Sequence, residues 1–458
     1  MRAKFVARLL VAFLFVAIVA FVLLLCHQLI RGHSVKKSDD FTYQPPKEPS
    51  HLIQRSVLLR YGDTDPLVIF SAHSHHDNIT IILASYGYMM RRLFCRLFDD
   101  QKQEILPAAQ TVVFPEFTVR CPASGSARFA AVSLNADDNV PASEMHSIEP
   151  ASTGASRNFL CGASLPAIHR AIENLILAGK QQHFFSVCMA PLWGNAPKWL
   201  MLIEFIEYYL LQGAEHFFIY KQHVDELTMT LLDKYIREGV ADVVEVSEAT
   251  NCLKRHRCRH EMQLQDCVFR SRGRSKWVAM VDLDERISVN SSNTLKQYIR
   301  YAFVGQAKKS FFRSVDDGSF GELRFRCRWV LRYAEIPADP ETWSKEGARI
   351  PMAIWHNTSH VAPLNHTTKS IIRPEMVEGM GVHQVLRFTP PATVFLVPPE
   401  QAVVRHYRNI QGWTFFLKEA EGFGSFEPTE VASNVIERLQ ERVLQEVDRL
   451  FLDKHSIV

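Results

Sequence analysis

Three carboxylates follow directly on a short apolar run near the middle of the chain. Residues 278–281, Val-Ala-Met-Val, have the character of a fully buried strand, and Asp282, Asp284 and Glu285 come immediately after them. Ligands of an open α/β sheet bind beyond the carboxyl ends of its strands, so these carboxylates would lie at the edge of a site. Asp282 and Asp284 are two residues apart and share one face if the strand continues.

Two converging carboxylates repel each other unless a cation lies between them. A hard divalent ion such as Mg²⁺ or Mn²⁺, which shares its coordination with a diphosphate, suits these oxygen ligands. An Asp-x-Asp pair is also frequent at solvated strand ends, so the motif by itself leaves both interpretations open.

The segment that carries these carboxylates alternates strands with helices from residue 183 onward, which is typical of a mostly parallel sheet. We expect strands over 184–189, 216–220, 240–246 and 277–285. We expect helices that begin near Pro197, Asp225 and Arg259. Right-handed crossovers bring the carboxyl ends of such strands to one edge, which would gather Pro191, Tyr220 and the three carboxylates.

The ordered motifs of this segment resemble glycosyltransferase family 92. The resemblance is carried by residues 187–191, 198–200, 204–209 and 216–220, Asp266-Cys267, and residues 277–285, 369–374, 382–383 and 406–408. It covers about residues 183–410 and implies a GT-A fold, in which a nucleotide-binding half ends in a DxD motif and an acceptor-binding half follows. It also implies an inverting hexosyltransferase; characterised relatives are β1,4-galactosyltransferases that use UDP-galactose and Mn²⁺ on glycan acceptors.

The resemblance further implies roles for single residues. Asp282 and Asp284 would bind the metal ion, with His383 as the third protein ligand, because histidine accepts Mn²⁺ readily. The positions expected to bind the nucleotide-sugar donor are Pro191, Tyr220, Asp266, Asp282, Lys369 and Arg373.

An inverting reaction also needs one general base within hydrogen-bond reach of the acceptor hydroxyl. Asp316, Glu322, Glu335 and Asp339 all follow Asp284 in the acceptor half. We favour Glu335 as the catalytic base. Members of the family often have a glycine-rich loop after the tryptophan that corresponds to Trp329, whereas this chain reads Val-Leu-Arg-Tyr-Ala-Glu there, so the acceptor stays open.

The first 60 residues predict a membrane anchor and a stem. Residues 1–8 are a basic tail, and residues 9–30 contain no Lys, Arg, Asp or Glu, which suffices to span a core of ~30 Å at ~1.5 Å per residue. This run exceeds the roughly 7–15 apolar residues of a cleaved signal peptide. We therefore expect a single-pass type II Golgi membrane protein, with the polar, proline-containing stem over 31–60 and a lumenal catalytic domain.

The glycosylation sequons and the cysteines also indicate a lumenal location. Asn78, Asn290, Asn357 and Asn365 each begin an N-glycosylation sequon. Eight of the nine cysteines lie beyond the anchor, an even number that predicts disulfides in an oxidising compartment. They lack paired CxxC spacing, which disfavours a structural zinc site, and about a hundred pairings are possible. Among these eight cysteines, we expect Cys252 to form a disulfide with Cys258.

Two further regions complete the expected domain order. Residues 61–182 form a β-rich subdomain with strands over 67–71, 79–83, 111–114 and 129–133, and residues 183–425 form the GT-A domain. The cluster at His73–Asp77 and the basic stretch 254–260 are expected to be solvated surface, and residues 136–157 a flexible insertion. Residues 426–458 carry an amphipathic helix.

Composition and motif details narrow the classes of function. A net charge of +3 without a long basic run does not suggest nucleic acid as a partner. An inactive, membrane-anchored glycan-binding protein with the same fold stays possible, as does a metal-dependent phosphohydrolase. The aspartyl-phosphate type of phosphatase would continue DxDx[TV], whereas Arg286 follows Glu285 here, so the hydrolase ranks last. The donor sugar, the acceptor and the linkage stay open.

Overall fold

The computed structural model describes residues 67–149 and 181–452, with gaps at 76–77, 195, 247–251, 253–254, 291–293, 302, 305–312, 317–318 and 410–413. The expected tail, anchor and stem therefore lie outside the described residues, as does the expected insertion from residue 150 onward. Among the helices of the described part, none is both long enough and apolar enough to cross a membrane.

The chain after residue 181 is built on a seven-stranded mixed sheet in the order β10-β9-β8-β11-β18-β15-β21. Its strands are β8 (His183–Leu192), β9 (His216–Lys221), β10 (Ala241–Glu245), β11 (Ser275–Val281), β15 (Phe320–Phe325), β18 (Lys369–Ile372) and β21 (Thr393–Leu396). The four strands from β8 to β11 are parallel, and β18 lies antiparallel to β11. The predicted parallel sheet is thus present.

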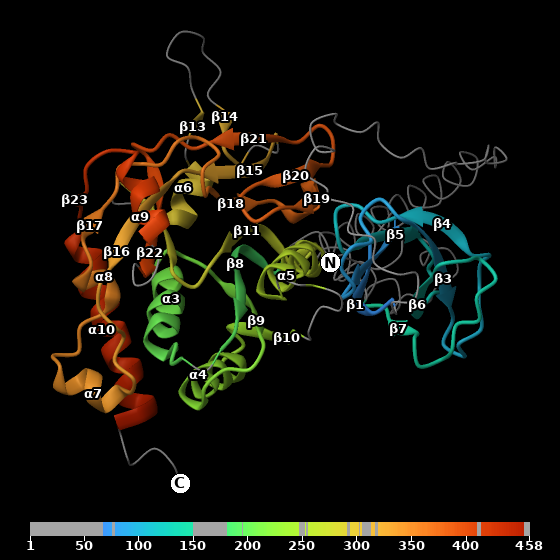
Figure 1. Ribbon diagram of the computed structural model, residues 1–458, viewed down its shortest axis with the longest axis horizontal. Coiled ribbons are helices and arrows are strands. Elements are labelled where there is room, and N and C mark those ends of the chain that lie inside the picture. Colours follow the sequence, from blue (N-terminus) through green and yellow to red (C-terminus); the bar gives the residue numbers. More distant parts are fainter. Residues whose placement is uncertain are drawn as a thin grey trace, which may run out of the picture. The chain divides into compact units, whose positions relative to one another are not determined.

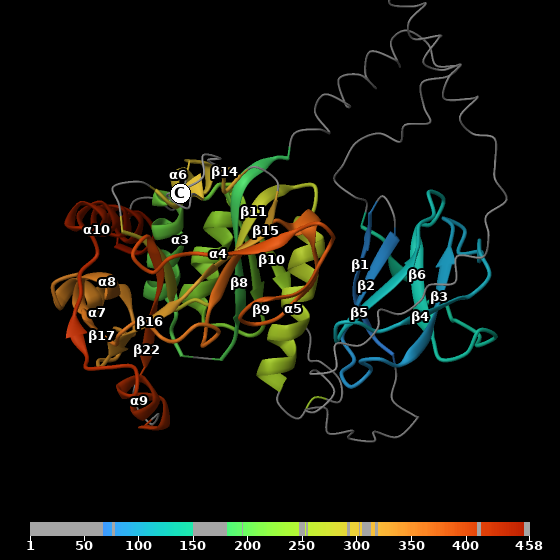
Figure 2. The same ribbon diagram turned by 90° about the horizontal axis from the view of Figure 1, so that it is seen from above.

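Helices cover both faces of this sheet. They are α3 (Trp199–Leu211), α4 (Glu226–Arg237) and α5 (Arg255–Ser271). Val187 and Met189 of β8 pack in the same buried cluster as α3 and α4, whereas Cys188 packs in the cluster that contains α5. Strand side chains alternate between the two faces, so α3 and α4 cover one face and α5 the other, as Figures 1 and 2 show.

A second sheet of five strands follows in the order β12-β22-β16-β17-β23. Its strands are β12 (Glu285–Val289), β22 (Ala402–Asn409), β16 (Cys327–Arg332), β17 (Asn357–Thr358) and β23 (Glu427–Pro428). Helix α10 (Ser433–Val447) buries Leu439, Val443 and Val447 in the cluster that α3 also joins, in agreement with the predicted amphipathic helix. The π-helical turn Asp448–Leu452 follows it.

Shorter elements connect these parts. They are α6 (Leu295–Tyr301), β13 (Phe303–Val304), β14 (Arg313–Ser314), α7 (Pro340–Lys345), α8 (Pro351–Ile354), the 3₁₀ turn Pro374–Met376, β19 (Val377–Met380), β20 (Val385–Phe388) and α9 (Thr414–Glu421).

The N-terminal β-rich region forms two small sheets. One contains β1 (Ile69–Ser74), β2 (Asn78–Leu83) and β5 (Thr118–Pro122); the other contains β3 (Arg92–Phe98), β4 (Ala109–Val112), β6 (Phe129–Ser133) and β7 (His146–Ser147). Each of the four predicted strands has a counterpart. Strand β3 escaped prediction because Arg92 and Arg96 interrupt its apolar pattern. Arg96 is nevertheless buried, because its guanidinium binds both carboxylate oxygens of Glu104 at 2.6 and 2.7 Å.

Two stretches that were expected to be solvated are partly buried. His73 lies in β1, is only 3% exposed, and places Nε2 2.8 Å from Asp266 Oδ1 of α5. In the basic stretch 254–260, Cys258 and Arg259 are buried within α5, which begins at Arg255 rather than at Arg259. The surface predictions were therefore wrong for His73, Cys258 and Arg259, whereas Arg257 is exposed as expected. A polar or charged side chain can be buried when a tertiary partner compensates it.

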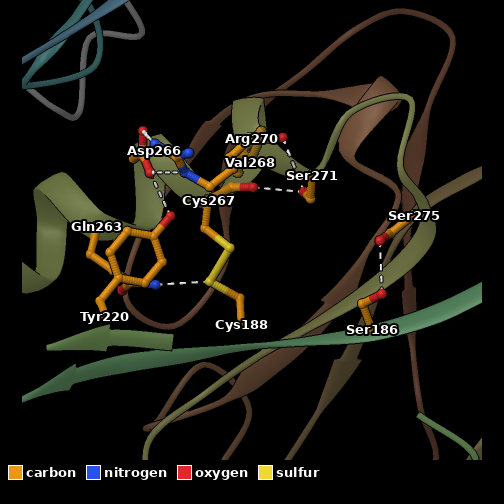
Figure 3. Close-up of a disulfide and its surroundings, with 10 residues drawn as sticks. All are labelled: Ser186, Cys188, Tyr220, Gln263, Asp266, Cys267, Val268, Arg270, Ser271 and Ser275. Carbon is orange, nitrogen blue, oxygen red and sulfur yellow. Dashed lines mark hydrogen bonds and ion pairs between the residues drawn. A yellow bond between two sulfur atoms is a disulfide. The ribbon is translucent and has the colours of Figure 1, made fainter. Parts of the chain in front are cut away.

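Three disulfides form within the described residues: Cys95–Cys121, Cys188–Cys267 and the expected Cys252–Cys258. Cys188–Cys267 joins the central strand β8 to α5 and is drawn in Figure 3. Cys327 is a buried free thiol, and Cys161 lies outside the described residues. Six of the eight cysteines beyond the expected anchor are therefore paired.

Candidate active site

The strand that precedes the carboxylates ends earlier than expected. β11 stops at Val281, and the chain turns before β12 begins at Glu285. The Glu285 N–H donates to the Asp282 carbonyl oxygen at 3.0 Å, and the Asp282 N–H donates to Glu285 Oε2 at 2.8 Å. Asp282 and Asp284 thus share a site because a tight turn presents them, and the predicted continuous strand over 277–285 was wrong.

Both aspartates line a cavity of about 1100 Å³. The described residues that line it are Ala190, Pro191, Leu192, Trp193, Gly194, Ala196, Pro197, Lys198, Met201, Arg257, Arg259, His260, Asp282, Leu283, Asp284, Arg332, Glu335, Ile336, Val382, His383 and Asn409. They come from the ends of β8 and β11, the starts of α3 and α5, the ends of β16 and β22 with the segment after β16, and the connection between β19 and β20. The carboxyl ends of strands from both sheets therefore meet at one site, as expected for an α/β fold.

Two buried cations compensate the aspartates. Lys369 Nζ lies 2.9 Å from Asp282 Oδ1 and 3.1 Å from Glu285 Oε2, and it is 2% exposed. His406 Nε2 lies 3.2 Å from Asp284 Oδ2. Burial disfavours every charge here, but Lys369 outweighs it and lowers the pKa of Asp282, while His406 lowers the pKa of Asp284. Both aspartates are therefore ionised at neutral pH.

Glu285 differs from the two aspartates. Burial, together with the neighbouring Asp282, raises the pKa of Glu285 to about 7, even though Lys369 and His406 favour its charge. Its carboxylate faces Lys369 on one side and His406 Nδ1 at 3.6 Å on the other. Glu285 thus connects the two cations behind the aspartates.

Two neutral imidazoles complete this part of the cavity. His383 Nδ1 lies 3.1 Å from the Thr368 carbonyl oxygen, so Nδ1 carries the proton and Nε2 keeps its lone pair. His260 Nε2 lies 3.5 Å from Asp282 Oδ1. Burial lowers the pKa of each histidine to about 4, and Lys369 adds to the effect at His383. His260 was not predicted as a site residue.

The predicted metal ligands Asp282, Asp284 and His383 all line the cavity. As the side chains stand, the described residues include no group of three or more His, Cys, Asp or Glu arranged to hold a metal ion. The donor set still fits Mn²⁺ or Mg²⁺ chemically, because it offers two ionised carboxylates and an imidazole nitrogen. A metal-binding histidine usually donates its other N–H to a carbonyl or carboxylate, as His383 does to Thr368.

Three basic side chains line the wall that the first turns of α3 and α5 provide. Lys198 Nζ donates to the carbonyl oxygens of Gly194 and Ala196 at 2.8 and 2.7 Å, and burial lowers the pKa of its ammonium group. Arg257 pairs with Glu261 at 3.0 Å, and Arg259 donates to the Gln222 side-chain oxygen. This wall is suited to phosphate oxygens.

The structure separates the residues that were predicted to bind the donor. Pro191 and Asp282 line the cavity, and Lys369 lies directly behind Asp282. Tyr220, Asp266 and Arg373 are not among the described residues that line it.

Tyr220, Asp266 and Arg373 instead make buried structural contacts. Asp266 has no exposed surface and accepts hydrogen bonds from Tyr220 at 2.5 Å and Arg270 at 2.8 Å, as Figure 3 shows. Arg373 contacts Asp316 at 3.2 Å and lies 4.5 Å above the Trp277 ring. Their place in a family motif is thus accounted for by packing around the seven-stranded sheet.

The four candidate bases differ in their surroundings. Asp316 accepts from Lys276 and from the Trp277 ring N–H, both at 2.8 Å, and Glu322 is fully buried against Arg324 and Ser370. Asp339 caps α7 by accepting from the Thr342 N–H at 2.8 Å. Of the four, Glu335 is the one that lines the cavity, and it is exposed there.

Several cavity residues were missed by sequence reasoning. They are Lys198, Arg257, Arg259, His260, Arg332, His406 and Asn409, of which His406 lies behind Asp284 and the others line the cavity. Lys198 and His406 lie inside the motifs that carry the family resemblance, which was an available signal. Arg332 and Asn409 are in register at the ends of β16 and β22, a relationship that only strand pairing creates.

Comparisons with known proteins identify the family of this chain. Residues 183–447 match the family described as glycosyltransferase family 92. A beta-1,4-galactosyltransferase, galt-1 of Caenorhabditis elegans, is 24% identical over 233 residues, which cover 47% of this chain and 45% of that protein. The matched part thus spans less than half of the relative's length.

Two solved structures show a weak similarity. HddC from Yersinia pseudotuberculosis has a TM-score of 0.26 and 12% identity, over 53% of this chain and 100% of that one. S. aureus TarS 1-349 has a TM-score of 0.26 and 11% identity, over 60% of this chain and 76% of that one. Similarities this weak do not indicate a shared function. The family match, in contrast, covers more than half of the sequence. The chain therefore belongs to glycosyltransferase family 92.

Proposed function

We propose that this protein is a metal-dependent, inverting hexosyltransferase of the GT-A type. It transfers galactose from UDP-galactose by direct displacement to a hydroxyl of a glycan on glycoproteins or glycolipids, with a β1,4 linkage. The observation that carries the proposal is the turn that presents Asp282 and Asp284 to a cavity of about 1100 Å³ beyond the parallel strands. The galactosyltransferase named above supports the choice of sugar and linkage.

Donor binding would divide between the carboxylates and the basic wall. Asp282, Asp284 and His383 Nε2 would hold Mn²⁺ or Mg²⁺, which supplies Lewis-acid stabilisation to a departing diphosphate. Lys369 and His406 keep the two aspartates ionised and oriented, since each lies within 3.2 Å of its partner. Lys198 and Arg259 offer further donors to the phosphate oxygens.

The acceptor would bind on the side of the cavity that the second sheet lines. Glu335 is exposed in the cavity wall, where its carboxylate can accept the proton of the attacking hydroxyl. A single displacement with one base inverts the anomeric carbon. Trp193, which is 54% exposed at the cavity, offers an apolar ring face against which a sugar can pack.

The proposed location is the Golgi lumen, with residues 9–30 as a type II anchor. Its supports are the uninterrupted apolar run of the sequence and the three disulfides, which suit an oxidising compartment.

The test is a screen of nucleotide sugars with the full-length protein in detergent. We expect Mn²⁺-dependent release of UDP from UDP-galactose above the rates with GDP- and CMP-sugars, and a further increase when a glycan acceptor is added. Glycan binding without any release of nucleotide would favour the inactive glycan-binding protein. Hydrolysis of simple phosphomonoesters would favour the phosphohydrolase.

A further inference from the structure

Arg332 is a half-buried guanidinium on the second-sheet side of the cavity. It is the last residue of β16 and is in register with Asn409 of β22, which lines the same cavity. Its guanidinium carbon lies 5.8 Å from the centre of the Trp355 ring. Within the described residues, its side chain has no hydrogen bond and no carboxylate at ion-pair distance.

A guanidinium in this position is poised for an anion. Burial lowers the pKa of Arg332, although the negative charges of Asp284 and Glu335 act to raise it. A charge that has lost part of its water without gaining an ion pair is costly, and an incoming anion removes that cost. The planar fork of arginine matches carboxylate, sulfate and phosphate groups through paired hydrogen bonds.

The donor diphosphate has other cations available. Lys198, Arg257 and Arg259 line the wall formed by α3 and α5, which belongs to the nucleotide-binding sheet. The negative charges of Asp282 and Asp284 are met by Lys369 and His406. Among the described residues that line the cavity, Arg332 is the cation that the second sheet contributes, and Glu335 follows it by three residues.

We propose that Arg332 binds an anionic group of the acceptor, so that the enzyme prefers an acidic glycan in which a carboxylate or sulfate lies close to the hydroxyl that receives the hexose. This inference rests on the proposed function and adds the chemical class of the acceptor. Arg332 and Glu335 then have complementary roles, because the guanidinium fixes the acidic group while the carboxylate meets the neighbouring hydroxyl.

The experiment compares pairs of oligosaccharide acceptors that differ only in one carboxylate or one sulfate ester. Full-length wild-type protein should use the acidic member of a pair roughly 10- to 100-fold better in kcat/KM, mainly through a lower KM, as a charge-assisted hydrogen bond provides. Carboxylated and sulfated pairs distinguish the two sources of the anion. In Arg332→Gln the ratio should fall toward one, whereas Arg332→Lys should retain part of it.

Arg328→Gln is the matched control. Arg328 lies on the same strand, is also half-buried, and is not among the described residues that line the cavity, so its loss should keep the wild-type ratio. Binding of UDP in the presence of Mn²⁺ is measured for every variant, to show whether a substitution affects the donor site.

Three outcomes would count against the inference. Equal use of neutral and acidic acceptors by the wild-type protein overturns it without any variant. Weaker UDP binding in Arg332→Gln, with an unchanged acceptor ratio, shows that Arg332 serves the donor and also overturns it. If the wild-type protein neither binds UDP nor releases it from any UDP-sugar, the proposed function itself fails, and the inference fails with it.

Discussion

Lys369 places its ammonium group 2.9 Å from Asp282 although the two residues are far apart in the chain. Lys369 begins β18, and Asp282 follows the end of β11, so the antiparallel pairing of these two strands brings them together. The carboxylates that would hold a metal ion are thus compensated by a cation of the fold itself.

Replacing Lys369 should destabilise the protein. Lys369→Met leaves the buried Glu285 and the half-buried Asp282 without their shared cation, and loss of one partner of a buried ion pair costs about 3–5 kcal/mol. Urea unfolding measures this loss. Lys369→Arg keeps the charge and serves as control; equal stability of the wild type and Lys369→Met would refute the structural role.

Asp284→Asn should remove activity while it leaves the fold intact. Asp284 lies in a turn, and its neutralisation removes one of two neighbouring negative charges. The amide oxygen can still accept from His406, so the fold should persist, with a moderate loss of thermal stability because His406 loses its charged partner. If Asp284 is a metal ligand as proposed, its loss should lower kcat by at least about 100-fold, since each ~1.4 kcal/mol is tenfold in rate.

Mn²⁺-dependent binding of UDP, measured beside thermal unfolding, checks this prediction. Asp316→Asn is a suitable control, because Asp316 accepts hydrogen bonds from Lys276 and Trp277 and is not among the described residues that line the cavity. It should lower the melting temperature and leave UDP binding unchanged. Unchanged UDP binding in a destabilised Asp284→Asn would instead make Asp284 a structural residue.

Asp266 should make stability depend on pH. Burial opposes its charge, but Arg270 and His73 outweigh burial and hold its pKa below the ordinary value of 3.8. Since the folded pKa is lower than the unfolded one, the stabilisation is present above pH 3.8 and is lost as the pH falls further.

Asp266→Asn tests this dependence. It should be less stable than wild type by about 3–5 kcal/mol at pH 7, and the difference should shrink below about pH 4. Chemical unfolding at a series of pH values measures both quantities. A difference that stays constant down to about pH 3 would exclude the ionised carboxylate as the cause.

The disulfides should be detectable by peptide mapping. We expect Cys95–Cys121, Cys188–Cys267 and Cys252–Cys258 in the non-reduced protein, and alkylation of Cys327 only after unfolding, because it is buried. Removal of Cys188–Cys267, which closes the longest loop of the three, should cost about 2–4 kcal/mol. Free alkylation of the six paired cysteines in native protein would contradict this pairing.

N-glycosylation should differ among the sequons. Asn290 and Asn365 are exposed, whereas Asn78 and Asn357 are half-buried and their sequon hydroxyls, on Thr80 and Ser359, are buried. A glycosidase should therefore change the gel mobility of the wild type but not of the double variant Asn290→Gln with Asn365→Gln. An unchanged mobility of the wild type would argue against the lumenal location.

Local patterns in the chain were enough to predict the elements of the parallel part of the seven-stranded sheet. Alternating apolar runs and helical periodicity located β8 to β11 and the helices between them, because each such segment carries its own pattern of burial. Local chemistry also located Asp282 and Asp284 at a strand end. The order of the family motifs predicted that His383 and the DxD motif share one site, and the structure places all three side chains at the same cavity.

The set of polar residues that share the cavity depends on tertiary contacts. Tyr220 and Asp266 face a buried network, while His260, Arg332 and Asn409 line the cavity, and no local pattern distinguishes these two groups. Their positions depend on pairing between strands that are distant in the chain, such as β16 with β22 and β11 with β18. Burying a charge without its partner is costly, and the fold rather than the neighbouring residues decides which partner meets it.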